Sequence, residues 1–404
     1  MTVISNNSYR LRSLRIQENS HCKVLFLRGC RTPGFWLRDR PIGTNTYLIG
    51  LRKPYILVDA AEGLESYLPI LTSALQGSNS TTTTTSSLST PDISDVIISH
   101  WHYDHIGGLP SVLTLLKNLW VKRNQGRETE YQGPKLHKYP LDKLETKTGG
   151  GGEGHLGSHN KLPDIEKTLQ KDSESKLYTA APDGSVFHDL YDGQKFVTVD
   201  KGTTTATLLE VLHTPGHSAD SICLYLPIDQ ALYTADTVLG HGTAVFEDLA
   251  EYMKSLNKML RFNETRNQGE EGEEQKSMAY YGILYPGHGD VLTNGPETIA
   301  TYIKHRMERE AQIVEVLRLP VPVEFQSSNT DDRQQQQQQL WTTWNLVRHI
   351  YKSYPENLWL PATRSVHLHL KKLGGDGIVR FVEGEGKDTM WELVAPAVPS
   401  SGSG

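Results

Sequence analysis

A short segment near residue 100 gathers several side chains that can bind a metal ion. Residues 99–105 read Ser-His-Trp-His-Tyr-Asp-His, supply His100, His102, Asp104 and His105, and follow the apolar stretch 95–98. Neutral imidazole and carboxylate are ligands that zinc takes in hydrolytic sites. Because side chains alternate along an extended chain, His100 and His102 are expected to face one ion. Asp104 and His105 can then turn toward a second ion.

Three later residues occupy similar places, each after an expected strand or in the turn that follows one. Pro215-Gly216 precedes His217, the apolar stretch 231–235 precedes Asp236, and Pro286-Gly287 precedes His288. Pro and Gly fix the backbone of a tight turn and so aim the next side chain. Taken singly, each residue has an ordinary alternative as a turn histidine or a helix-capping carboxylate. Their shared position favours one site that also contains the first four residues.

The seven residues resemble the His-x-His-x-Asp-His signature and the later His, Asp and His of the metallo-β-lactamase superfamily. The resemblance implies an α+β fold, an αββα four-layer sandwich with its site at one edge. It also implies two zinc ions (Zn2+), the first held by His100, His102 and His217, the second by Asp104, His105 and His288, with Asp236 bridging them. Asp104 and Asp236 are predicted to act in catalysis as well.

The expected nucleophile is a hydroxide between the metals, since two zinc ions about 3.5–4 Å apart can lower the pKa of a shared water toward about 7. The chain has no Gly-x-Ser-x-Gly elbow and no phosphate-binding loop, which argues against a serine hydrolase and against nucleotide-dependent chemistry. By the same resemblance, Asp59 orients a ligand and His213 binds no metal. His241 could donate a proton to a leaving group, although a solvent-facing loop histidine is the favoured interpretation.

The composition is that of a protein working inside the cell. The 404 residues carry a net charge of −6 without a long run of Lys and Arg, and the three cysteines are too few for a disulfide framework. No stretch approaches the roughly 20 apolar residues of a membrane helix, and no secretory signal is evident. We therefore expect an intracellular protein without a membrane partner, in the mitochondrial matrix or the cytosol.

Composition shifts divide the chain into parts. Residues 1–20 are predicted to be a flexible N-terminus or a weak presequence, because the first fifteen residues contain three arginines and no acid. Residues 21–325 form the predicted hydrolase domain, with disordered insertions at about 78–90, 122–176 and 264–277. A polar Gln-rich linker at 326–339, a second domain at 340–395 and a flexible tail at 396–404 complete the prediction.

Hydrophobic periodicity places the elements of the hydrolase domain. One sheet is expected from strands at 24–27, 46–49, 55–58 and 95–98, and a second from strands at 185–187, 195–199, 205–212, 221–226, 231–235 and 281–284. Helices are expected at 64–75, 109–121, 249–261 and 296–317, the last of which closes the domain. The metal-binding motifs then fall at strand ends. Binding and catalytic residues often lie on such loops, which a rigid scaffold holds in place.

The C-terminal region has the layout of a small winged helix. Apolar residues recur at helical spacing over 344–351, a second helix is expected at 364–373, and hairpin-like strands at 378–382 and 389–393 follow. The basic residues between 341 and 380 outnumber the acids by four; they are Arg348, Lys352, Arg364, Lys371, Lys372 and Arg380. A solvated helix face explains this surplus about as well as a nucleic-acid surface does.

Motifs along the whole chain resemble the β-lactamase-like protein 2 family. They include Gly-Thr-Asn-Thr-Tyr at 43–47, Val-Phe-Glu-Asp-Leu at 245–249, and Pro-Glu-Asn-Leu at 355–358. This resemblance implies an endoribonuclease that cleaves single-stranded RNA. The alternative is an acyl thioesterase of the polyketide or carrier-protein type, in which the same hydroxide attacks a thioester. A third hypothesis is an inert binding protein, against which the complete ligand set argues.

Overall fold

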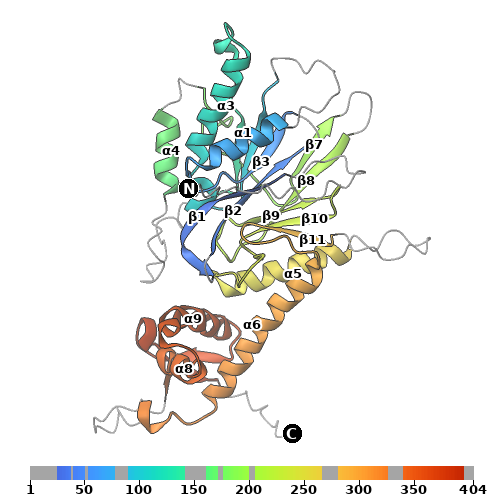
Figure 1. Ribbon diagram of the computed structural model, residues 1–404. Helices are drawn as coiled ribbons and strands as arrows, with labels where there is room; N and C mark the ends of the chain where they lie inside the picture. Colours follow the sequence, from blue (N-terminus) through green and yellow to red (C-terminus); the bar gives the residue numbers. More distant parts are fainter. Residues whose placement is uncertain are drawn as a thin grey trace, which may run out of the picture.

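The computed structural model describes residues 25–37, 40–50, 53–77, 90–141, 161–171, 176–199, 205–265, 281–325 and 340–394. Two sheets face each other within the first 300 residues (Figure 1). The first has the order β1 (Leu25–Leu37), β2 (Arg40–Ile49), β3 (Tyr55–Val58), β4 (Ile93–Ile98), β5 (Lys135–Lys138) and β6 (His188–Asp189). The second has the order β11 (Ile283–Pro286), β10 (Ala231–Ala235), β9 (Ile222–Leu226), β8 (Thr205–His213) and β7 (Lys195–Val199).

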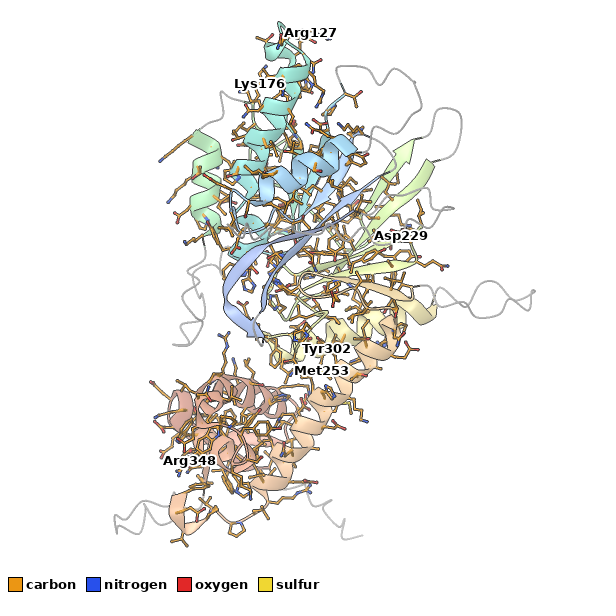
Figure 2. All side chains as sticks on the ribbon, in the orientation of Figure 1. Arg127, Lys176, Asp229, Met253, Tyr302 and Arg348 are labelled. Carbon is orange, nitrogen blue, oxygen red and sulfur yellow. The ribbon has the colours of Figure 1, made fainter. Side chains whose placement is uncertain are left out.

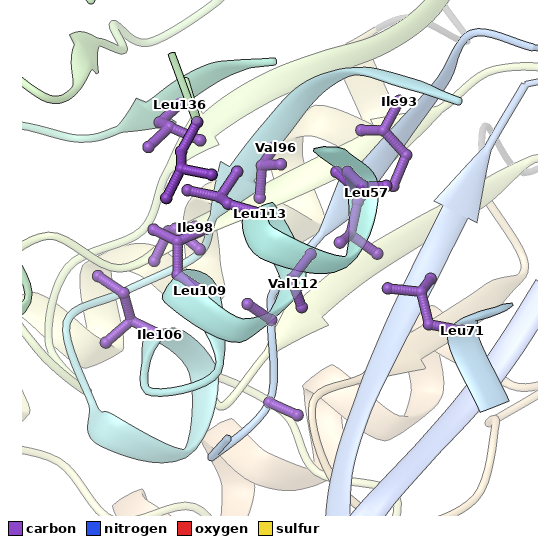
Figure 3. Packing of buried hydrophobic residues seen from close by; sticks show 14 of the residues in the cluster. Leu57, Leu71, Ile93, Val96, Ile98, Ile106, Leu109, Val112, Leu113 and Leu136 are labelled. Carbon is purple, nitrogen blue, oxygen red and sulfur yellow. The ribbon is translucent and has the colours of Figure 1, made fainter. Parts of the chain in front are cut away.

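Helices cover the outer faces of both sheets, so the four layers are helix, sheet, sheet and helix. Over the first sheet lie α1 (Tyr67–Gly77), α3 (Leu109–Arg123) and α4 (Leu162–Lys171), and over the second lie α5 (Leu249–Thr265) and α6 (Gly295–Leu317). The last three residues of strand β4, Val96 to Ile98, are apolar on both faces of the sheet, and both faces are covered. Its Val96 and Ile98 pack with Val112 of α3 (Figure 3), whereas Ile97 packs with Val211 between the sheets. The predicted αββα sandwich is confirmed.

The C-terminal module is a three-stranded sheet with two helices. Its sheet has the order β12 (Trp341–Thr342), β14 (Met390–Leu393) and β13 (Val379–Phe381), and its helices are α8 (Thr343–Ile350) and α9 (Trp359–Gly375). The Thr342 hydroxyl caps α8 by accepting a hydrogen bond from the Asn345 amide at 3.0 Å. Helix α6 runs on into this module, where Ile313 and Val316 join its core. The second half of α6 thus packs with the module, whereas the sequence assigns all of that helix to the hydrolase domain.

Several sequence predictions need correction. The supposed insertion at 122–176 contains strand β5, paired with β4 and β6, and helix α4, so those parts of it are ordered pieces of the fold. Residues 185–187 are not a strand; β6 begins at His188 and belongs to the first sheet instead of the second. Helix α9 starts five residues before the expected position. The predictions for 1–20, 326–339 and 396–404, and much of those for the insertions, lie outside the described residues.

Candidate metal centre

The residues 99–108 leave the sheet abruptly and turn into a short helix. Strand β4 ends at Ile98, so His100 and His102 stand in a turn and not in the extended strand that the sequence suggested. The single-turn helix α2 (Tyr103–Ile106) follows, and the His105 amide donates to the His102 carbonyl at 3.0 Å. A Cβ on Gly108 would lie 2.1 Å from the Ala60 carbonyl oxygen, so glycine is required for this loop to sit against the loop after β3.

Three imidazoles converge at one point. Nε2 of His100 lies 2.9 Å from Nδ1 of His102, and Nε2 of His217 lies 2.9 Å from that Nδ1 and 3.2 Å from Nε2 of His100. Ligand atoms around a tetrahedral zinc ion are roughly 3.3 Å apart, because each lies about 2.0–2.1 Å from the metal. Burial lowers the pKa of His102 to about 3 and that of His100 well below its usual value. These rings are therefore neutral, as a metal ligand must be.

A second group lies beside the first. Nε2 of His288 is 3.1 Å from Oδ2 of Asp104 and 3.4 Å from Nε2 of His105. Burial opposes a charged imidazole here, but Asp236 and Asp104 raise the pKa of His288 to about 10. A bound cation would replace the protons that these rings hold, so metal binding at this group would release protons.

Asp236 lies between the two groups. Its Oδ1 is 3.3 Å from Nε2 of His105, and its Oδ2 is 3.3 Å from Nε2 of His288 and 3.7 Å from Nε2 of His217. Although burial opposes ionisation, the imidazoles of His288 and His105 hold the pKa of this carboxyl well below its usual range. A Cβ on Gly287 would lie 2.4 Å from Oδ1, so the carboxylate position requires that glycine. One carboxylate thus reaches both ligand sets.

All seven predicted residues meet at one edge of the sandwich, on loops from both sheets. Groups that could hold an ion are His100 with His102 and His217, Asp104 with His105 and His288, and His100 with His105 and Asp236. Imidazole nitrogen and carboxylate oxygen in this combination suit zinc. The residues present therefore fit a two-metal site, with four loops contributing ligands.

Comparison with known proteins agrees with this geometry. Residues 39–288 match the model of the metallo-beta-lactamase superfamily, and residues 342–391 match a beta-lactamase associated winged helix domain. The chain belongs to the metallo-β-lactamase superfamily. It is a metal-dependent hydrolase of that type with a C-terminal winged helix, as the sequence predicts.

Relatives of this superfamily chain span most of its length. A "Beta-lactamase-like protein 2 homolog" of Caenorhabditis elegans is 30% identical over 83% of this chain and 80% of its own. An "Atrochrysone carboxyl ACP thioesterase" of Aspergillus chevalieri is 28% identical over 88% of this chain and 83% of its own. A crystal structure of a beta-lactamase domain protein from Burkholderia ambifaria, 15% identical, shares the fold with a TM-score of 0.51 over 93% of this chain and 91% of that one.

Outer hydrogen bonds orient the candidate ligands of this superfamily site. Nδ1 of His217 donates to the Val245 carbonyl at 2.8 Å, and Nδ1 of His105 to Oδ2 of Asp59 at 2.6 Å. Nδ1 of His288 lies 3.3 Å from the Gly43 carbonyl. Because Nδ1 of each ring is turned to an acceptor outside the site, each Nε2 faces the site and can bind a metal once it carries no proton.

Asp59 is the centre of a buried network at the end of β3. Its carboxylate accepts hydrogen bonds from the amide and hydroxyl of Ser99, both at 2.8 Å, and from the hydroxyl of Tyr233. Ser99 in turn lies 2.9 Å from Nδ1 of His100. The geometry matches the ligand-orienting part expected of Asp59, since it touches ligands of both groups directly or through one residue.

The other histidines that the sequence singles out lie apart from the ligand groups. Nε2 of His213 donates to the Ala219 carbonyl at 2.9 Å, and the ring stacks on Tyr139 with centroids 3.7 Å apart. It belongs to none of the metal-binding groups of the described residues, as expected. His241 is exposed and also outside those groups, which agrees with the favoured interpretation of a loop histidine.

Sequence reasoning missed Glu62, a half-buried carboxyl beside the site. Burial and the nearby Asp104 raise its pKa to about 7, and its Oε1 is buried without a hydrogen-bond partner among the described residues. Glu62 stands three residues after Asp59 in the loop that packs on Gly107 and Gly108. That short spacing from a predicted site residue is the only signal that could have marked it.

Proposed function

We propose that this hydrolase is an endoribonuclease that cleaves single-stranded RNA with two zinc ions held by the seven residues. The observation that carries the proposal is a complete ligand set that opens to solvent beside a docked winged helix. The side chains of Asp104, His288 and Asp236 are 20%, 15% and 11% exposed, whereas His105 is fully buried. The second group is therefore reachable from solvent, and a substrate would enter there.

Zinc bound here would supply a water of lowered pKa and polarise the scissile group. Asp104 and Asp236 present carboxylate oxygens at the open side, where they can accept a hydrogen bond from the attacking water and orient it. The buried imidazoles hold fixed positions and exclude water from behind the site. In phosphodiester hydrolysis, a P–O bond forms to the water oxygen, the P–O bond to the leaving sugar oxygen breaks, and that oxygen takes up a proton.

The winged helix offers cations next to the hydrolase domain. Leu368 of α9 packs against the core of the second helical layer, so this side of α9 meets the domain. Arg364 and Lys371 stand within about 60° of Leu368 round the helix, given about 100° per residue. No ion pair involves either of them among the described residues. Two cations on the face of α9 that meets the hydrolase domain suit a polyanionic strand.

Three other basic residues of the module already have partners and do not add to this surface. Lys372 binds Glu310 and Asp376, Arg380 binds Glu392, and Arg348 lies 4.5 Å from the Phe325 ring centroid. The labelled Arg348 also stands on the side of the module away from the hydrolase domain (Figure 2). The RNA surface of the proposal therefore follows α9, where Arg364 and Lys371 stand.

A thioesterase is the second candidate, because a relative of similar span bears that name. Exposed apolar side chains near the site favour it: Leu64 follows the Glu62 loop, and Tyr103 precedes Asp104; both are 41% exposed. An acyl chain could lie on such side chains, and the attack of water on the thioester carbonyl would release a thiol and a carboxylic acid.

One paired assay separates the two candidates. The zinc-loaded full chain is incubated with end-labelled single-stranded RNA of about 30 nucleotides and, separately, with an acyl-pantetheine thioester. We expect RNA fragments from the wild type and none from His102→Ala, because that variant loses a ligand of the first group. Replacing Arg364 and Lys371 with alanine should raise the KM for RNA severalfold and leave kcat unchanged. Thioester hydrolysis with intact RNA would refute the nuclease.

A further inference from the structure

The loop between β10 and α5 touches a metal ligand that lies far from it in the sequence. The Val245 carbonyl accepts the hydrogen bond from Nδ1 of His217 at 2.8 Å. The Glu247 amide donates to the Gly216 carbonyl at 2.7 Å, so the loop is joined to the His217 turn at two points. The orientation of the His217 ring therefore depends on where residue 245 stands.

Helix α6 fixes this loop on both sides of Val245. Nη2 of Arg306 donates to the Ala244 carbonyl at 2.9 Å, and its guanidinium lies 4.8 Å from the ring centroid of Phe246. One turn earlier, the Tyr302 hydroxyl lies 3.2 Å from the Leu239 amide. A single arginine thus contacts both neighbours of the residue whose carbonyl holds the ligand.

The winged helix supports the same contact from behind. His369 of α9 is fully buried, and its ring lies edge-on to Phe246 with centroids 6.2 Å apart. Glu310, one turn after Arg306 on α6, lies 3.6 Å from Nδ1 of His369. In Figure 2 the labelled Tyr302 marks where α6 leaves the hydrolase domain toward the module. Arg306 therefore lies at the junction of the two parts.

We propose that Arg306 is a positioning residue for the metal ligand His217, acting through the carbonyl of Val245. The guanidinium is planar and permanently charged, so it can bond a carbonyl and cover a ring at once. Without it, residues 244–246 lose a buried donor and a ring contact, and the imidazole loses its fixed acceptor. The group that contains His100 and His102 then binds its ion more weakly. The proposal holds whichever substrate the site hydrolyses.

The test measures metal affinity site by site. Arg306→Met keeps the length of the side chain and removes the donor and the charge. Loss of an outer-shell partner weakens metal binding about 10- to 100-fold, and we expect about tenfold here because Arg306 is one residue further out. In competition with a chelator, the variant should lose one of its two ions more readily than the wild type does and hold the other equally tightly. In the cobalt-substituted protein, the visible absorption of the three-histidine site should change, and that of the Asp104, His105 and His288 site should not.

Arg309→Ala is the matched control on the same helix. Its guanidinium lies 4.7 Å from the Tyr351 ring centroid and bonds Gln312, so it supports the module without touching the loop. The proposal is wrong if both variants bind both ions as tightly as the wild type does. It is also wrong if both variants lose the same affinity for both ions. Should Arg306→Met not fold, Phe246→Leu removes the ring that Arg306 covers. This variant must then lower the metal affinity of the three-histidine site at least threefold for the proposal to stand.

Discussion

Asp59 reaches His105 with Oδ2 at 2.6 Å from Nδ1, and it does so from a buried position with a φ of 60°. The carboxylate keeps the proton on Nδ1, and so leaves Nε2 free for a metal. Asp59→Asn preserves the shape and tolerates the positive φ, but it removes the charge. We expect the ion at the Asp104, His105 and His288 group to bind about 10- to 100-fold more weakly. Chelator competition followed by metal analysis measures this.

Tyr233→Phe is the control for Asp59. Its hydroxyl donates to the same carboxylate without contacting His105. Loss of this one donor should leave metal affinity within about threefold, because the carboxylate keeps its charge and its bonds to Ser99. If Asp59→Asn and Tyr233→Phe lost the same metal affinity, the network would act only by holding the loops in place. The charge of Asp59 would then have no separate effect.

Gly108 is expected to tolerate no side chain. The added Cβ of Gly108→Ala would stand 2.1 Å from the Ala60 carbonyl oxygen, so the loop that carries Asp59 must move. Overpacking of this kind costs about 1–3 kcal/mol or more, and we expect lower metal content as well. Gly375→Ala, in α9 with nothing within 4 Å of the added Cβ, should be neutral or slightly stabilising. Denaturant unfolding of both variants checks this, and equal stabilities would contradict it.

The seven candidate residues were readable from the sequence because local signals mark them: four lie together just after one strand, Asp236 directly follows another strand, and two histidines follow a Pro-Gly turn. Strand β5 was not, because its residues Lys135–Lys138 include two lysines and a histidine and look like solvent-exposed chain. Burial of those groups depends on partners from elsewhere: Asp95 lies 2.8 Å from His137, and Asp220 lies 2.5 Å from Lys138. Such pairs are invisible to hydrophobic periodicity.

Helix α4 did carry a local signal that the surrounding composition hid. Leu162, Ile165 and Leu169 are buried and stand at helical spacing. The polar, glycine-rich residues before them favoured an interpretation of the whole segment as an insertion. Arg306 is the opposite case, because nothing near it in sequence indicates that it contacts Ala244, 62 residues away. Contacts of that kind require the fold.

The Lys138–Asp220 pair joins the first sheet to the His217 turn and is almost fully buried, with side chains 5% and 0% exposed. Asp220→Ala would leave the lysine charge buried and unpaired, which costs about 3–5 kcal/mol. The exposed pair of Lys254 and Glu251 is the control, since Glu251→Ala should cost less than about 1 kcal/mol. Guanidinium unfolding of the zinc-loaded proteins measures both, and a small loss for Asp220→Ala would show that Lys138 finds another partner or reaches water.

Asp229, in the turn between β9 and β10, should make stability depend on pH. Burial raises the pKa of its carboxyl to about 6, and its Oδ2 is buried without a hydrogen-bond partner among the described residues. A raised pKa in the folded state means that the ionised form is disfavoured there. The cost is absent below the unfolded value near 4, grows as pH rises between about 4 and 6, and is complete above about 6.

Replacing this carboxyl by an amide removes the cost. The shift of about two units sets a ceiling of about 3 kcal/mol, and partial solvent access reduces the expected gain for Asp229→Asn to about 1 kcal/mol at pH 8 and about half of that at pH 5. The exposed Asp189 at the end of β6 is the control, and Asp189→Asn should stay within about 0.5 kcal/mol of the wild type. The free energy of unfolding of each variant at pH 5 and pH 8 tests this prediction. An equal gain at both pH values would mean that the ionisation of Asp229 is not the cause.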